Sequence, residues 1–158
     1  MFGRRTTVIA VVALVLASGG VAVAQADGGS GASSVVIGAG QSGEWFQISQ
    51  REGNDVVTVQ NTFLAGGFSG WHSHPGITMV IVVSGEITLF REAVKGGKCR
   101  VQTYVAGDVF LERPGDEANA VNHGTVAAVV AATFFNVPHG TPPPTRIDRT
   151  APLNCPVV

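Results

Sequence analysis

Charged residues are scarce in this sequence, and those of one sign never gather. Asp, Glu, Lys and Arg together make up 13% of the 158 residues, the formal net charge is −1, and no run of Lys or Arg occurs. Nucleic-acid-binding proteins need a basic patch, usually with aromatic side chains among the cations. The composition therefore predicts that nucleic acid is not a partner.

Helical periodicity is also missing. No segment repeats apolar residues at the 3.6-residue spacing of an amphipathic helix, and turn residues recur about every 8–12 positions. Short strands at that spacing are typical of β-sandwiches and barrels. We therefore expect an all-β fold with strands within residues 35–37, 45–49, 55–62, 77–83, 86–91, 100–104, 109–111, 119–122 and 126–137.

The N-terminus has the three parts of a secretory signal peptide. Arg4 and Arg5 form a basic start, residues 7–17 are apolar, and Ala-Val-Ala at 22–24 offers small residues for cleavage. A membrane anchor is the alternative, but the apolar run is shorter than the ~20 residues that span a bilayer. We expect a secreted, extracytoplasmic protein with no membrane segment once residues 1–24 are removed. The paired arginines leave the general and twin-arginine routes open.

The rest of the chain is long enough for one domain. Without residues 1–24 it has 134 residues, with 8 basic and 11 acidic side chains. Residues 25–33 are a Gly/Ser-rich linker for which we expect disorder. Residues 34–137 carry the predicted strands. Residues 138–158 are rich in proline, which cannot donate to a sheet ladder, so we expect an extended, irregular tail packed on the domain.

Only two cysteines occur, Cys99 and Cys155. An even number of cysteines in an exported chain predicts a disulfide, and two free buried thiols are the alternative. The bond would attach the proline-rich tail to the domain.

The chemistry is concentrated around His72 and His74. Side chains on a strand alternate between its faces, so histidines at i and i+2 point the same way. Two neutral imidazoles on an inner face suit a divalent transition metal such as Zn, Mn, Fe, Ni or Cu. From spacing alone, two strand histidines donating to backbone carbonyls explain the pattern equally well.

Two stretches of sequence resemble the two motifs of the cupin family. The first motif, G-x5-H-x-H-x3,4-E-x6-G, is matched by Gly66, His72, His74 and Gly85. The second, G-x5-P-x-G-x2-H-x3-N, is matched by Gly107, Gly115 and Asn122. The resemblance covers residues 56–137. It implies a single cupin domain, which is a double-stranded β-helix or jelly-roll barrel.

Two ligand positions of the family differ in this chain. Thr78 stands where the motif has its metal-binding glutamate, and Ala118 stands at the second-motif histidine. An alignment anchored on the motif proline would instead put Asn119 there. The remaining candidates are a stand-in carboxylate at Glu117, which we expect to be solvated, and His123 and His139, which lie in turn or surface sequences.

We therefore expect an exported cupin that binds a divalent metal, a small molecule or both, through His72 and His74, in a pocket inside the domain. The alternatives are a metal-dependent enzyme (a dioxygenase, isomerase or decarboxylase) and a structural or interaction domain with a degenerate site. The sequence is compatible with a homodimer, and it identifies no substrate.

Overall fold

The computed structural model describes residues 33–92 and 97–155, and these residues form strands and no helix. The signal peptide predicted at 1–24 and nearly all of the linker predicted at 25–33 lie outside this part. No helix in the described segments is long and apolar enough to cross a membrane. The strands are β1 (Gln41–Ser42), β2 (Asp55–Phe63), β3 (His72–Ser73), β4 (Thr78–Ser84), β5 (Glu86–Glu92), β6 (Arg100–Val105), β7 (Asp108–Glu112), β8 (Glu117–Val121), β9 (Ala128–Val137) and β10 (Ile147–Asp148).

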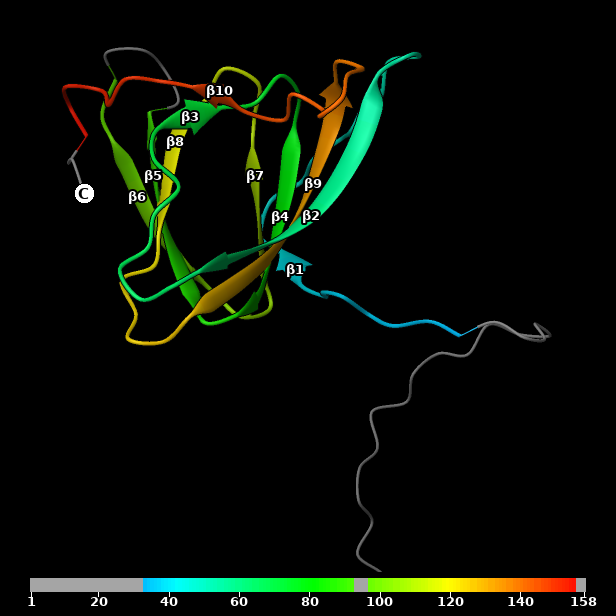
Figure 1. Cartoon of the computed structure of the whole chain (residues 1–158). Coiled ribbons are helices and arrows are strands. Elements are labelled where there is room, and N and C mark those ends of the chain that lie inside the picture. The colour runs from blue at the N-terminus through cyan, green and yellow to red at the C-terminus, as the bar shows by residue number, and fades with distance from the viewer. Residues whose placement is uncertain (1–32, 93–96, 156–158) are drawn as a thin grey trace, which may run out of the picture. The chain divides into compact units, whose positions relative to one another are not determined.

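The strands form two five-stranded sheets that face each other (Figure 1). One has the order β1-β7-β4-β9-β2 and the other β10-β3-β8-β5-β6. Among themselves, the eight strands β2–β9 pair in antiparallel fashion, four in each sheet. Eight antiparallel strands divided between two facing sheets form the jelly roll that is typical of cupins. The predicted all-β cupin fold is thus confirmed, with two separate sheets among the described strands.

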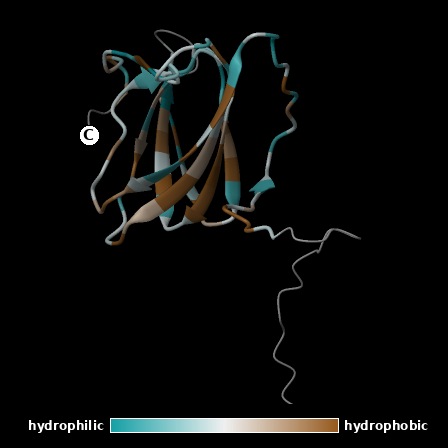
Figure 2. Cartoon of the chain, turned by 45° about the vertical axis from the view of Figure 1, so that its right-hand side comes forward, coloured by the Kyte–Doolittle hydropathy of each residue, from teal (hydrophilic) through white to brown (hydrophobic). Residues whose placement is uncertain are grey.

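Apolar side chains from both sheets meet between them. Alternate residues of β4, among them Val80 and Val82, point inward and pack against Ile87 and Leu89 of β5. The long central strands carry much of the brown, hydrophobic colouring (Figure 2). Inward positions along a sheet alternate with outward ones, so the core also fixes which polar side chains face inward.

The motif glycine Gly85 makes the tight β4–β5 connection possible. Its φ is +74°, a backbone conformation that glycine adopts without strain. A Cβ placed there would lie 2.8 Å from the Cα of Ala128. A larger residue would therefore push β9 away from this turn.

Two predicted strands near the N-terminus are wrong. Residues 35–37 and 45–49 are not strands, and Trp45 is 83% exposed. Among the described residues before β2, the only strand is β1, which pairs two residues in parallel with β7. Apolar residues alone do not form a strand when no sheet edge is there to receive their backbone groups.

The tail holds a strand that the sequence analysis did not predict. β10 pairs with β3 in antiparallel fashion, joining Ile147 to Ser73 and Asp148 to His72. The prolines at 142–144 precede β10 and leave its own N–H groups free to donate.

The predicted disulfide is present between Cys99 and Cys155. Cys155 packs with Trp71, Phe90 and Val121 in a second apolar cluster, apart from the main core. The bond therefore fixes the tail to the sheet that carries β3. A disulfide also indicates that the protein works in an oxidising environment.

Candidate metal site

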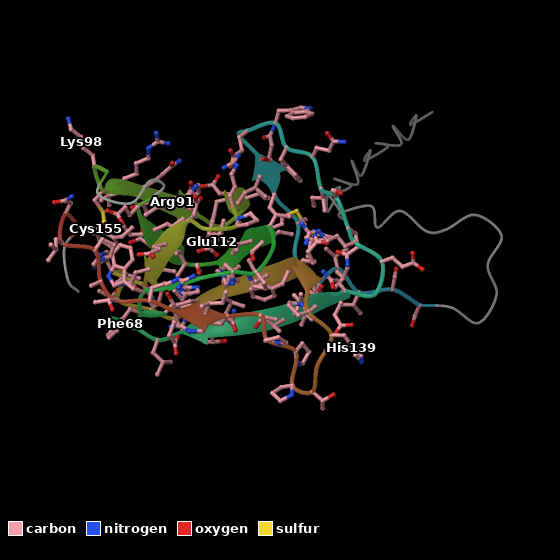
Figure 3. The ribbon with its side chains drawn as sticks, turned by 90° about the horizontal axis from the view of Figure 1, so that it is seen from above. Phe68, Arg91, Lys98, Glu112, His139 and Cys155 are labelled. Atoms are coloured by element: carbon pink, nitrogen blue, oxygen red, sulfur yellow. A yellow bond between two sulfur atoms is a disulfide. The ribbon has the colours of Figure 1, made fainter. Side chains whose placement is uncertain are left out.

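His72, His74 and Glu112 come together at one end of the space between the sheets. One nitrogen or oxygen atom from each of the three lies within 4.8 Å of the others. All three side chains are buried, with exposures of 7%, 7% and 6%. Figure 3, viewed from the end that carries β3 and β10, shows Glu112 between the sheets and His139 far away at the edge. The structure thus confirms that His72 and His74 face one point, and it adds a carboxylate.

Glu112 stands directly across the sheet from the position that lacks the family's glutamate. β4 and β7 pair in antiparallel fashion with Thr78 opposite Glu112. Opposite residues in such a pair place their side chains on the same face. The carboxylate missing from β4 is therefore present on β7.

The register of the second motif is settled by the strand pairing. Ala118 of β8 lies opposite His72 of β3, so its methyl group points to the face that carries the histidine. Asn119 points to the other face, where it accepts a hydrogen bond from the Ser69 hydroxyl (3.3 Å). Ala118 is the residue at the motif position, and it brings no ligand there.

The histidine rings are held by backbone carbonyls. Nδ1 of His72 donates to the carbonyl of Gly70 (2.8 Å), and Nδ1 of His74 donates to the carbonyl of Thr145 (2.7 Å). With Nδ1 protonated, Nε2 of a neutral ring carries the lone pair. Metal-binding histidines are usually oriented by such a bond from the second ring nitrogen.

His74 and Glu112 form a buried pair, with Nε2 and Oε2 3.3 Å apart. Burial lowers the pKa of His74, but the hydrogen bond and charge of Glu112 outweigh it and hold that pKa above its usual value. Burial also works against the ionised form of Glu112, yet the bond to His74 keeps the pKa of the carboxyl below its usual value. A negative carboxylate facing Nε2 therefore favours a positive charge at this point, either a proton or a metal ion.

His72 behaves differently. Burial lowers the pKa of His72 below its usual value, and the charge of Glu112 does not compensate for this. At neutral pH its ring is therefore neutral and can act as a ligand without first losing a proton.

Two oxygen atoms at the site have no hydrogen-bond partner within the described part of the chain. These are Oε1 of Glu112 and the hydroxyl of Thr78, both fully buried. A buried polar atom without a partner costs about 1–3 kcal/mol, and more for a charged group. Such atoms usually mark a position for an ion or for ordered water.

A stretch of the tail, residues 145–149, lies across the site; we call it the strap. It contributes the Thr145 carbonyl to His74, and the Arg149 backbone N–H donates to the carbonyl of Trp71 (3.0 Å). Nε of Arg149 donates to the hydroxyl of Ser73 (2.9 Å). The strap therefore fixes both the backbone of β3 and the orientation of one candidate ligand.

The three residues open onto a cavity of about 580 Å³ between the sheets. Most of its wall is apolar, including Phe63, Phe110 and Phe134. Pockets of this size with few polar groups are typical of small-molecule sites.

The other candidates do not reach the site. Glu117 lies 3.9 Å from Nε of Arg149, and His123 is exposed beside Phe90. His139 is exposed and pairs with Asp55 (3.1 Å). The exposed positions of the two histidines agree with the prediction, whereas Glu117 is only partly exposed.

Glu112 was missed because it precedes Arg-Pro-Gly and looks like a solvated charge at the end of a strand. The sequence signal that could have identified Glu112 is the alternation of inward and outward side chains along a strand. Phe110 belongs to the core, and Glu112 shares its face because side chains alternate along β7.

No family model and no curated protein matches this sequence. Similar solved structures include a conserved protein with a double-stranded beta-helix domain from Klebsiella pneumoniae, at 25% identity over 52% of this chain and 69% of that chain, with a TM-score of 0.46. An oxalate oxidase is similar at 26% identity over 51% of this chain and 41% of that one (TM-score 0.47).

Peruvianin-I from Thevetia peruviana latex, described as a cysteine peptidase, is similar at 25% identity, with a TM-score of 0.46. The match spans 49% of this chain and about half (48%) of Peruvianin-I. Some of these structures have the double-stranded β-helix fold, which the strand order of this chain shows by itself. The chemistry of the site rests on the residues described above.

Proposed function

We propose that this protein is exported and binds a divalent transition metal through His72, His74 and Glu112. The cavity beside these residues would hold a small molecule. The observation that carries the proposal is the buried carboxylate of Glu112. One of its oxygens faces Nε2 of His74 at 3.3 Å, and the other has no partner among the described residues.

The donor set fits a metal ion. Two imidazole nitrogens and one carboxylate oxygen are ligands that Zn²⁺, Fe²⁺ and related ions accept. Both rings already have Nδ1 fixed, so Nε2 is the atom presented. Removing the ion would leave the carboxylate facing a ring nitrogen, which explains why the metal-free pair favours a proton on His74.

Three protein ligands are fewer than the four of a closed structural zinc site. Ala118 supplies no ligand atom at the motif histidine position, and the site borders the cavity. A bound ion would supply Lewis-acid character to a small molecule held there.

That openness also supports a second candidate function, a metal-dependent enzyme, because catalytic metal sites keep a position for substrate. Binding without turnover would favour the first function, and turnover of a small molecule only in the metal-loaded protein would favour the second.

Export is supported by two independent features. The sequence begins with a basic start, an apolar run and Ala-Val-Ala, and the structure contains the Cys99–Cys155 disulfide. N-terminal sequencing of exported material should find a start near Gln25, and an intact Met1 would contradict export by cleavage.

The metal proposal is tested by titrating purified protein with Zn²⁺, Mn²⁺ and Ni²⁺ by calorimetry. We expect one ion per chain in wild type and binding weakened at least tenfold in His72→Ala. His123→Ala is the matched control, because His123 is exposed and does not line the cavity. Equal binding by wild type and His72→Ala would refute the proposal.

A further inference from the structure

Several polar groups of the cavity lie at the end where the strap crosses β3, and Asn61 and Thr62 of β2 line it elsewhere. His72, His74, Ser69, Thr145 and Arg146 all line the cavity there, whereas the wall between the sheets is mainly apolar. Arg146 is the one cavity-lining cation with a permanent charge among the described residues. It lies in the tail, outside the stretch that resembles the cupin motifs.

Arg146 is held in place from both sides. The preceding residue gives its carbonyl to His74, and the following two residues form β10 on β3. Its Nε donates to Asp148 (2.6 Å), and one terminal nitrogen donates to the carbonyl of Ser69 (2.9 Å). A guanidinium fixed in this way loses little further freedom when it binds a ligand.

The guanidinium keeps donors for a ligand. An arginine side chain has five N–H groups. Two of those of Arg146 are used by Asp148 and Ser69, and the rest have no acceptor within the described residues. Free N–H groups on one planar fork match the two oxygens of a carboxylate.

The charges select an anion when a metal is bound. A divalent ion with two neutral histidines and Glu112 leaves one positive charge at the site. Arg146 adds a second, and Asp148, which is 85% exposed outside the cavity lining, offsets one of them. Without the ion, the carboxylates of Glu112 and Asp148 offset the charge of Arg146, and no excess positive charge remains at the site. The metal-loaded cavity therefore complements a ligand with one negative charge.

We propose that Arg146 is a specificity-determining residue that receives the carboxylate of a small monocarboxylic acid, whose apolar body fills the cavity between the sheets. The inference rests on the proposed metal function, because the excess positive charge exists only with an ion bound. The carboxylate and the metal must then strengthen each other's binding by the same factor.

The test uses purified protein loaded with one equivalent of Zn²⁺ and titrated with phenylacetate and with phenylacetamide, which has the same shape without the charge. We expect phenylacetate to bind at least tenfold more tightly than the amide to wild type. In Arg146→Gln this preference should disappear, because charge-assisted hydrogen bonds of this kind are worth a factor of about ten to a hundred. Arg146→Lys should restore part of it.

Arg51→Gln is the control. Arg51 is an exposed cation that precedes β2 and does not line the cavity. It should keep the preference for phenylacetate, and Zn²⁺ affinity in Arg146→Gln should stay within about threefold of wild type, since Arg146 is no metal ligand.

The outcomes are distinguishable. Zn²⁺ binding with no preference for phenylacetate, or with a preference that survives in Arg146→Gln, would overturn the role of Arg146 and leave the metal function intact. Absence of Zn²⁺ binding would overturn both. Phenylacetate binding as tightly to metal-free as to Zn²⁺-loaded wild type would overturn the charge argument.

Discussion

Replacing Glu112 with glutamine tests the residue that the motif did not predict. The substitution keeps the shape of the side chain and removes its charge, so core packing between the sheets should be unchanged. Two charges 4 Å apart contribute about 4 kcal/mol at an effective dielectric constant of about 20. Part of this is offset by the cost of burying the carboxylate.

We therefore expect Glu112→Gln to lose about 3 kcal/mol of Zn²⁺ binding free energy, which corresponds to a Kd for Zn²⁺ about 100-fold higher than in wild type. Titration against a chelator of known affinity measures this ratio directly. Co²⁺ is a useful second probe, because its visible absorption reports a change in the ligand set. In the metal-free variant, the pKa of His74 should fall, since Glu112 is what holds it up.

Glu117→Gln is the control, because Glu117 is a partly exposed carboxylate on the neighbouring sheet that pairs with Arg149 instead. It should bind Zn²⁺ as wild type does. If Glu112→Gln and Glu117→Gln both match wild type, Glu112 is no ligand and our account of the site is wrong.

Three further predictions follow from the same geometry. Ala118→His, which adds an imidazole opposite His72, should tighten Zn²⁺ binding about tenfold or more, and a chelator titration showing no gain would mean that position 118 does not reach the ion. In the metal-free protein, the raised pKa of His74 gives stability that is present below about pH 6.5 and lost as pH rises through that pKa, and the lowered pKa of Glu112 gives stability that is present above about pH 4.5 and lost as pH falls through its folded value. The free energy of unfolding in urea, measured across pH, should therefore show the full contribution of the pair between about pH 4.5 and 6.5. Zn²⁺ affinity should instead rise as pH rises through the His74 pKa, because the ring must lose its proton to bind the ion. Cys155→Ala should lower the free energy of unfolding by about 2–4 kcal/mol in urea, since the bond closes a loop across 56 positions, and an unchanged midpoint would contradict this.

Local patterns predicted much of the fold. Every predicted strand from residue 55 onward has a counterpart, because alternation of side chains and turn residues are properties of neighbouring positions. The histidine pair and the alanine at position 118 were placed for the same reason, since both follow from fixed spacings within a motif.

The missing parts depend on contacts between distant segments. Alternation places Glu112 on the inner face of β7, but its closeness to the two histidines comes only from the folded arrangement of distant strands. The role of the strap could not be predicted for the same reason. Its proline-rich sequence suggests only an irregular tail, whereas its role comes from the Thr145 carbonyl, which lies 71 positions from His74 and orients its ring. The failed strands at 35–37 and 45–49 show the converse, where local preference found no sheet edge.

The strap also imposes an order on how the site is assembled. His72 and His74 are synthesised long before Thr145, yet the ring of His74 receives its orienting carbonyl only when the strap docks on β3. The contact joins positions 71 residues apart, so it cannot form until the chain has been synthesised past Thr145. A partly synthesised chain would therefore hold its two histidines without the full ligand geometry. If the site binds a metal as proposed, the ion would be selected by the fully folded chain, in the compartment where folding is completed.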